Sequence, residues 1–181
     1  CGCGFSKYKI VVAPVLYMVK DGMKEALENF VKNGGILITT FMSGIVGQSD
    51  NVYLGGYPGR SRDGGGMVEE IDALAPEQKN KAKFADGSTA ACGLLCDLMH
   101  LEGAKALASY EEDFYAGMPA ASKNTYGKGT TYYIATQFEE EGLAKIWIRQ
   151  SRRPEFHPLS RKKPDLKLSH ASVIPRDSIS S

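Results

Sequence analysis

Two apolar runs separated by an amphipathic segment constrain the fold of this 181-residue chain more than any other feature. The run Ile10–Ala13, in "YKIVVAPVLYM", is continuous and is closed by Pro14, which is typical of a strand that is buried on both faces in a parallel sheet. A second run of this kind, "ILITTF", follows a Gly-Gly pair. Parallel neighbours need a long crossover connection, so the pattern predicts a right-handed βαβ unit.

The segment between the two runs, "KDGMKEALENFVKNGG", predicts the crossover helix. Its apolar residues recur at helical spacing and are Met23, Ala26, Leu27, Phe30 and Val31. Asp21 is a plausible N-cap, and Gly34-Gly35 can adopt the left-handed conformation that ends a helix.

The remainder of the chain is predicted to be rich in strands. "MVEEIDAL" predicts one strand, and "AKFADGSTAACGLLCDLMHL" predicts two strands joined at the turn Asp86-Gly87. Further strands surround a second turn at 126–129, and a final helix begins in "FEEEGLAKIWI". The glycine-rich segment Ser43–Gly66 is predicted to be an extended functional or contact loop. The fold class is therefore α/β with a β-rich second half.

Three regions follow from composition along the chain. Residues 1–4, "CGCG", are interpreted as a foreign or truncated N-terminus, and residues 5–147 as one domain. Residues 148–181 hold eight Lys/Arg against three Asp/Glu, four prolines and no sustained period. Such a segment cannot bury enough apolar surface to offset its ordering entropy, so we expect an irregular basic tail that is not native to the domain.

Overall charge and cysteine content exclude several classes of protein. A net charge of +1 argues against a nucleic-acid platform, and no apolar run reaches the length of about 20 residues that spans a bilayer. The four cysteines, Cys1, Cys3, Cys92 and Cys96, do not form the pattern of a disulfide framework. A reducing compartment, the cytoplasm, is the expected location.

The bend after the second apolar run is where a nucleophile would be expected. A nucleophile elbow has the pattern G-x-S-x-G, whereas this chain reads "TFMSG", with bulky Phe41 in place of the first glycine. Ser43 is therefore interpreted as a turn hydroxyl and not as a nucleophile.

Other candidate chemistry is equally incomplete. Cys92, Cys96 and His100 share an i, i+4, i+8 spacing, but a structural zinc site needs four ligands, and core thiols are common. A Cys-His pair for nucleophilic catalysis stays open as an alternative. The acidic runs at 69–70, 111–113 and 139–141 single out no carboxylate pair for glycoside hydrolysis. The glycines of "LGGYPGRSRDGGG" match no phosphate-binding pattern.

Several stretches resemble a known family over residues 5–143. "VAPVLYM", "GGYPG", "DFYAG" and "YGKG…YYIAT", in that order, are similar to the trimerisation domain of family 42 glycoside hydrolases, the bacterial β-galactosidases. The resemblance implies a Rossmann-like fold related to class I glutamine amidotransferases, with a mostly parallel sheet flanked by helices. It also implies that the catalytic glutamates belong to a separate TIM barrel, so no catalytic, cofactor-binding or metal-binding residue is assigned here.

The leading hypothesis is an assembly domain whose partners are further copies of itself, in a trimer, and the catalytic barrel of the parent enzyme. Exposed aromatics with arginine are typical interface anchors, and the candidates are Tyr53, Tyr57, Arg60, Phe114 and Tyr115. The alternative for these aromatics is that they cover the sheet edge. Two alternative functions also stay open. One is a free-standing amidotransferase-like enzyme that uses Cys92 or Cys96 with His100. The other is a small-molecule binding module at the carboxyl ends of the parallel strands, near residues 14–17 and 41–43.

Overall fold

The structure is a computed structural model and describes residues 4–52, 65–151 and 172–175. Within these residues the chain forms ten strands and two helices. The strands are β1 (Tyr8–Ala13), β2 (Ile36–Thr40), β3 (Gly66–Ala73), β4 (Asn80–Phe84), β5 (Thr89–Leu101), β6 (Lys105–Tyr110), β7 (Pro119–Tyr126), β8 (Gly129–Ile134), β9 (Thr136–Phe138) and β10 (Ser172–Pro175). The helices are α1 (Met23–Lys32) and α2 (Glu140–Ser151). Neither of these helices has the length and apolar character that a membrane crossing requires.

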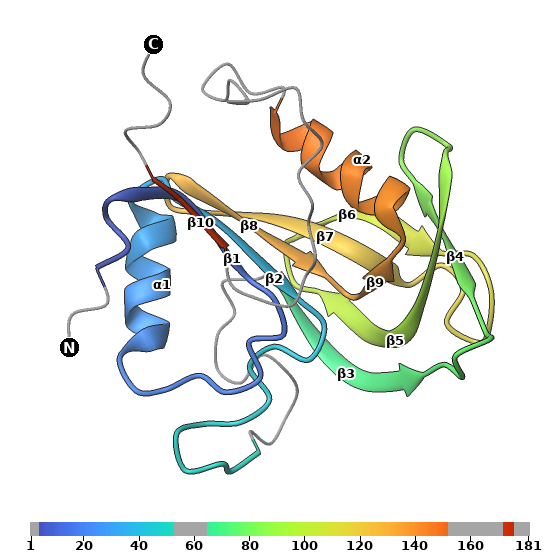
Figure 1. Cartoon of the computed structure of the whole chain (residues 1–181), viewed down its shortest axis with the longest axis horizontal. Helices are drawn as coiled ribbons and strands as arrows, with labels where there is room; N and C mark the ends of the chain where they lie inside the picture. Colours follow the sequence, from blue (N-terminus) through green and yellow to red (C-terminus); the bar gives the residue numbers. More distant parts are fainter. Residues whose placement is uncertain (1–3, 53–64, 152–171, 176–181) are drawn as a thin grey trace.

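The strands form one mixed sheet in the order β10-β1-β2-β8-β7-β6-β4-β5-β3, and β9 pairs with β5. Within the described residues, only β1 with β2 and β2 with β8 pair in parallel, and every other pairing is antiparallel. Figure 1 shows α1 beside β1 and β2 at one end of the molecule, with β4 and its neighbours at the other end.

The expected Rossmann-like, amidotransferase-like sheet, mostly parallel and flanked by helices, is wrong. The described chain is dominated by strands that pair antiparallel, and it has two helices. The physical reason lies in the connections, because turns or short loops join β4 to β5, β6 to β7 and β7 to β8. A short turn returns the chain beside the strand it has just left, which gives antiparallel pairs, whereas a parallel pair needs a crossover of a dozen residues or more.

The predicted βαβ unit is confirmed. Strand β1 pairs in parallel with β2, with Ile10 opposite Ile36, and α1 supplies the crossover. The predicted N-cap is wrong, since Gly22 (φ 77°) precedes α1 and no side chain caps it. The helix ends at Lys32, and Gly34, just beyond the C-cap Asn33, has the expected left-handed conformation with a φ of 99°.

The second half of the sheet closes on itself. Strand β4 pairs with β5 and β6, β6 with β7, and β7 with β8. Strand β9 follows β8 after Ala135 and pairs with β5, so the chain of pairings returns to its start. Both predicted hairpins, at Asp86-Gly87 and at 126–129, belong to this ring and are confirmed.

Small and aromatic side chains together fill the main core. Ala82, Ala120 and Ala121 are fully buried beside Tyr110 and Tyr115. Alternating small and large residues suits the limited interior of a small closed sheet. A second core lies on one face of the parallel strands, where Val11 of β1 contacts the α1 cluster of Leu27, Phe30 and Val31.

The C-terminal part of the chain contains more regular structure than its composition predicted. The α2 helix runs to Ser151, and β10 pairs antiparallel with β1, with Val11 opposite Val173. Strand β10 thereby covers the edge of β1 (Figure 1). The expectation that residues 148–181 are irregular does not hold for these two elements, and the remainder of that tail lies outside the described residues.

Candidate functional site

The bend that follows β2 has the backbone shape of an elbow but does not present a nucleophile. Met42 has a φ of 56°, in the left-handed region that non-glycine residues seldom adopt, and Gly44 follows with a φ of 70°. The strained position is therefore held by a thioether side chain, which cannot be deprotonated to a nucleophile.

Ser43 is a turn hydroxyl, as predicted. Its side chain is only 4% exposed, and Oγ donates a hydrogen bond to the carbonyl of Thr40 at 2.6 Å. The same oxygen accepts the backbone N–H of Leu16 at 3.1 Å. Both hydrogen-bonding roles of the hydroxyl serve the backbone, and no described histidine contacts it.

A buried carboxylate braces this bend from the opposite side. Asp97 of β5 is 1% exposed, and its Oδ2 accepts the backbone N–H of Met42 at 3.2 Å and the hydroxyl of Tyr133 at 2.5 Å. Its Oδ1 is buried without a hydrogen-bond partner among the described residues. Asp97 thus links the end of β2 to β5 and β8, where the parallel strands join the closed part of the sheet.

The electrostatic state of Asp97 follows from this environment. Burial raises the pKa of its carboxyl from 3.8 to about 6, and the hydrogen bonds from Tyr133 and Met42 oppose the increase. Burial also raises the pKa of the Tyr133 phenol well above its ordinary value, and the neighbouring Asp97 adds to that effect. Tyr133 therefore remains the proton donor in this contact.

The loop after β1 is attached to the same bend. Thr40 Oγ1 accepts the backbone N–H of Val15 at 2.8 Å, and the carbonyl of Leu16 accepts the N–H of Gly44 at 2.8 Å. The carbonyl of Tyr17 accepts the N–H groups of Ile45 and Val46 at 3.0 and 3.1 Å. The loops that follow the two parallel strands therefore form one hydrogen-bonded unit.

The residues proposed for thiol catalysis do not come together. Cys92 and Cys96 are fully buried in the main core, and burial raises the pKa of the Cys92 thiol to about 12. His100 lies exposed on β5, where Nε2 contacts Glu69 Oε2 at 2.6 Å. A thiol that stays protonated inside the core, with the imidazole on the surface, is not the arrangement of a nucleophile and its base.

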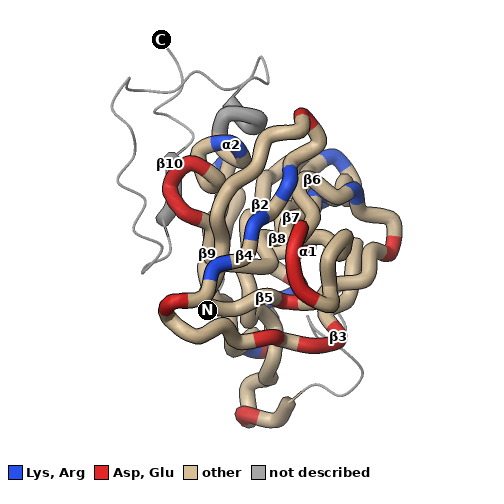
Figure 2. The backbone as a smooth tube through the Cα atoms, turned by 90° about the vertical axis from the view of Figure 1, so that its right-hand side faces the viewer, with Lys and Arg blue, Asp and Glu red and all other residues tan. Residues whose placement is uncertain are grey.

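The acidic runs at 69–70, 111–113 and 139–141 are exposed, and Figure 2 shows Asp and Glu on several separate segments of the backbone. Glu112 pairs with Lys81 at 3.0 Å, and Glu139 pairs with Lys79 at 3.4 Å. In each of these pairs both side chains are at least half exposed. Within the described residues, no group of three or more His, Cys, Asp and Glu side chains is arranged to hold a metal ion.

The predicted interface residues have different positions. Phe114 is 72% exposed, whereas Tyr115 is 1% exposed and packs edge-on against Tyr110 with ring centroids 5.0 Å apart. Tyr115 is thus a core residue within this chain. The other three candidates, Tyr53, Tyr57 and Arg60, lie outside the described residues. The interface stays a prediction.

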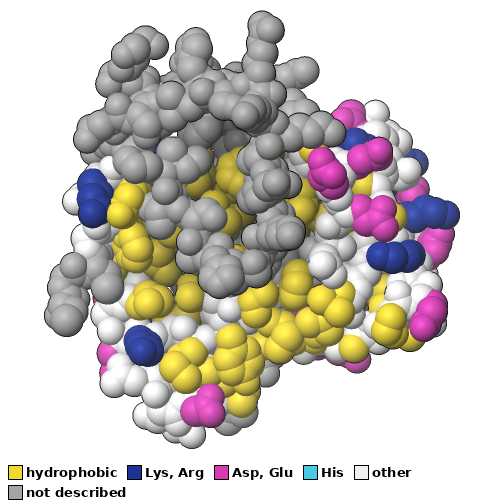
Figure 3. Space-filling model, in the orientation of Figure 1, with side chains coloured by type: hydrophobic (Ala, Val, Ile, Leu, Met, Phe, Trp, Pro, Cys, Tyr) yellow, Lys and Arg dark blue, Asp and Glu magenta, His cyan; other side chains and the backbone are white. Residues whose placement is uncertain are grey.

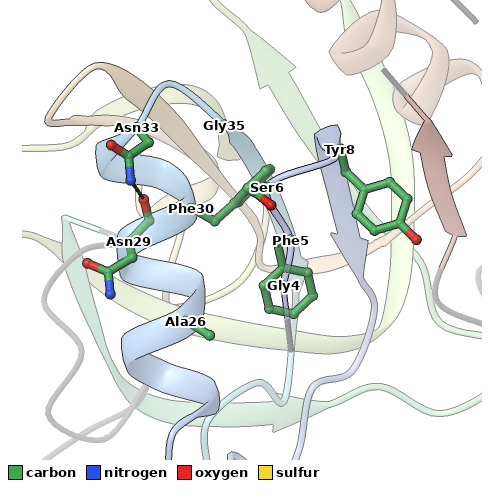
Figure 4. A pocket seen from close by; sticks show the side chains of 9 residues that line it. All are labelled: Gly4, Phe5, Ser6, Tyr8, Ala26, Asn29, Phe30, Asn33 and Gly35. Atoms are coloured by element: carbon green, nitrogen blue, oxygen red, sulfur yellow. Dashed lines mark hydrogen bonds between the residues drawn. The ribbon is translucent and has the colours of Figure 1, made fainter. Parts of the chain in front are cut away.

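A hollow of about 320 Å³ lies between the N-terminal segment and α1. Phe5 and Phe30 contribute apolar walls, and Asn29 and Asn33 also line the hollow, with amide groups that point away from Phe5 in Figure 4. The Nδ2 of Asn33 is already bonded to the carbonyl of Asn29 at 2.7 Å. Among the described residues, no charged side chain lines this hollow, which lies apart from the bend after β2.

Comparison with known proteins decides the family. The family model described as "Beta-galactosidase trimerisation domain" matches residues 1–153, which is most of the chain. The chain belongs to the β-galactosidase trimerisation domain family. This membership confirms the resemblance that the motifs carry, while the amidotransferase-like class receives no support from the matches.

Relatives of this trimerisation domain are parts of much longer proteins. A β-galactosidase of Lactobacillus acidophilus, LacA, is 51% identical over 144 residues, which cover 79% of this chain and 21% of the relative. Another β-galactosidase, Pbg of Clostridium perfringens, is 47% identical over 158 residues, covering 83% of this chain and 23% of the relative. The chain therefore spans about a fifth of the length of these relatives.

Solved structures agree with the fold of the trimerisation domain. A β-galactosidase from Bacillus circulans sp. alkalophilus superposes with a TM-score of 0.84 at 40% identity, over 90% of this chain and 25% of that one. The cold-adapted β-galactosidase from Rahnella sp. R3 gives a TM-score of 0.83 at 38% identity, over 88% of this chain and 25% of that one.

Sequence reasoning missed Asp97 and Thr40, which hold the two loops in place. Asp97 had a signal, since it is the only charged residue in the apolar run "CGLLCDLM", and a lone acid in such a run indicates a buried carboxylate. The sequence gives no comparable signal for Thr40, because threonine is common in strands.

Proposed function

We propose that this chain is the assembly module through which a β-galactosidase forms a trimer, and that it takes no part in bond cleavage. The observation that carries the proposal is the match of residues 1–153 to the trimerisation family. The site geometry supports it, because the bend after β2 uses Ser43 and Asp97 for backbone contacts.

The partners that we propose are further copies of this chain and the catalytic barrel of a longer β-galactosidase, which would hydrolyse terminal β-D-galactosides. The names of the relatives at 51% and 47% identity support this assignment. We also propose a cytoplasmic location without contact to membrane or nucleic acid, supported by the free buried thiols of Cys92 and Cys96 and the net charge of +1.

An activity assay tests the non-catalytic role. The purified chain is incubated with a chromogenic β-galactoside, and we expect no turnover above that of a heat-denatured sample. Asp97→Asn serves as the matched variant, because Asp97 is the buried carboxylate beside the bend. Turnover by the wild-type chain that Asp97→Asn abolishes contradicts the proposal.

A further inference from the structure

We propose that the loop Pro14–Met18 is the contact surface on which a second copy of this chain docks, with Val15 and Tyr17 as its apolar anchors. This inference rests on the proposed assembly function and specifies where the assembly contact lies.

Exposure of apolar side chains singles out this loop. Val15 is 44% exposed and Tyr17 is 40% exposed, and Val52, in the neighbouring segment that follows β2, is 50% exposed. Val46, in the hydrogen-bonded bend, forms bridges to both Met18 and Val52, which places the two loops side by side. Apolar side chains form a band across the lower part of Figure 3, which begins in the region that these loops occupy in Figure 1 and continues toward β3. Contiguous exposed apolar surface commonly marks an interaction site.

The backbone of Val15 is the second observation. Its φ is 47°, and a β-branched residue in the left-handed region is a true outlier. The hydrogen bond from its N–H to buried Thr40 holds this conformation. Strained residues that the surroundings over-determine gather at functional positions. Here the strained backbone holds an apolar side chain that is 44% exposed to solvent.

The loop is also held by hydrogen bonds within the single chain. Hydrogen bonds from the backbone of residues 44–46 to the carbonyls of Leu16 and Tyr17 fix its shape, and Asp97 fixes the bend beneath it. A surface that is already ordered loses less conformational entropy on binding. Burial of a small apolar area can therefore be enough to stabilise the complex.

The absence of charge in the loop Pro14–Met18 favours a second copy as the occupant. No Asp, Glu, Lys or Arg occurs in residues 10–19, and the neighbouring described residues 41–52 hold one charged residue, Asp50. An acidic or basic partner would find no ion-pair partner in the loop Pro14–Met18 itself. An uncharged apolar surface, in contrast, can meet another copy of the same chain without bringing like charges together.

Val15→Asn tests the proposal in the full chain. Asparagine tolerates the left-handed conformation but removes the apolar side chain. We expect an unfolding midpoint that is unchanged or higher, together with a dissociation constant for self-association that is at least about tenfold weaker, as for loss of an interface anchor. Sedimentation velocity over a concentration series gives the dissociation constant, and Tyr17→Ser is measured in parallel.

Leu94→Asn is the matched control. Leu94 is also apolar, 53% exposed and left-handed, with a φ of 67°, but it lies in β5, away from the two loops. We expect its self-association to equal that of the wild type. Should Val15→Asn lower the unfolding midpoint, Tyr17→Ser carries the test alone.

The outcomes separate this inference from the assembly function. A wild-type chain that associates, with Val15→Asn and Tyr17→Ser associating equally well, overturns the docking surface and leaves the assembly function in place. Equal weakening by Leu94→Asn also overturns the docking surface. A wild-type chain that stays monomeric over the whole concentration series overturns both proposals.

Discussion

Replacing Asp97 by asparagine tests the electrostatic account of the bend after β2. Asparagine keeps a side-chain oxygen that can accept the bonds from Met42 and Tyr133, but it cannot ionise. The carboxyl of Asp97 has a folded-state pKa of about 6 against an ordinary value of 3.8, because burial disfavours its charged form. At about 1.4 kcal/mol per pKa unit, ionisation of Asp97 costs the folded state about 3 kcal/mol at neutral pH.

The sign of the pH dependence follows from that shift. Between pH 6 and pH 4 the folded chain binds a proton at Asp97 that the unfolded chain does not, so Asp97 makes the wild type more stable as the pH falls. From pH 7.5 to pH 4.5 this gain is about 2 kcal/mol, and Asp97→Asn lacks it. The cost of placing the asparagine NH₂ where Oδ1 is unpartnered is the same at both pH values and cancels in the comparison.

The assay is urea unfolding of both proteins at pH 7.5 and pH 4.5, at one protein concentration. We expect the free energy of unfolding of Asp97→Asn minus that of the wild type to be about 2 kcal/mol larger at pH 7.5 than at pH 4.5, so that the variant gains stability relative to the wild type as the pH rises. Asp21→Asn, at an exposed position, is the control and should follow the wild type. A constant difference between Asp97→Asn and the wild type across this range would falsify the reasoning.

Three further predictions concern packing, the turn hydroxyl and the thiols. Gly129→Ala places a methyl group 2.1 Å from the carbonyl oxygen of Val31, and we expect thermal unfolding to show a free energy of unfolding that is lower by about 3 kcal/mol or more. Gly4→Ala is the control, because a methyl group there meets nothing within 4 Å, and its melting temperature should equal that of the wild type. Ser43→Ala removes the hydrogen bonds of the hydroxyl to the backbone of Leu16 and Thr40, and should lower the free energy of unfolding in urea by about 1–3 kcal/mol. An unchanged urea midpoint would count against the role of Ser43 in the turn. When the native chain is incubated with iodoacetamide, Cys92 and Cys96 should stay unmodified because both thiols are buried, whereas both should be alkylated in guanidinium. Mass spectrometry of the peptides that carry them measures the modification. Fast modification of Cys92 in the native chain would contradict its burial.

The first half of the fold was predictable because local signals and the tertiary structure agree there. Continuous apolar runs, a helical stripe and Gly34 at a left-handed helix end all indicate a βαβ unit, and the parallel pairing of β1 with β2 confirms it. The overall fold class was not predictable by extending that unit. The turns at Asp86-Gly87 and 126–129 were recognisable, but the ring that contains them closes through the pairing of β9 with β5, which no local pattern signals.

The candidate site was predictable only in part. The pattern around Ser43 correctly excluded a nucleophile, since its hydroxyl bonds to the backbone of Thr40 and Leu16. The brace by Asp97 depends on β5 reaching the end of β2, a contact between residues 55 positions apart that no local pattern contains. Exposure of Val15 likewise depends on a backbone angle that favours glycine and that valine seldom adopts.

The central claim is that this chain assembles with further copies of itself, and its molar mass in solution tests that claim most directly. Multi-angle light scattering of the purified chain, eluted from a size-exclusion column at several loading concentrations, reports the mass of each species. The account predicts a species of three times the mass of one chain whose fraction grows with concentration. A single species with the mass of one chain at every concentration contradicts it.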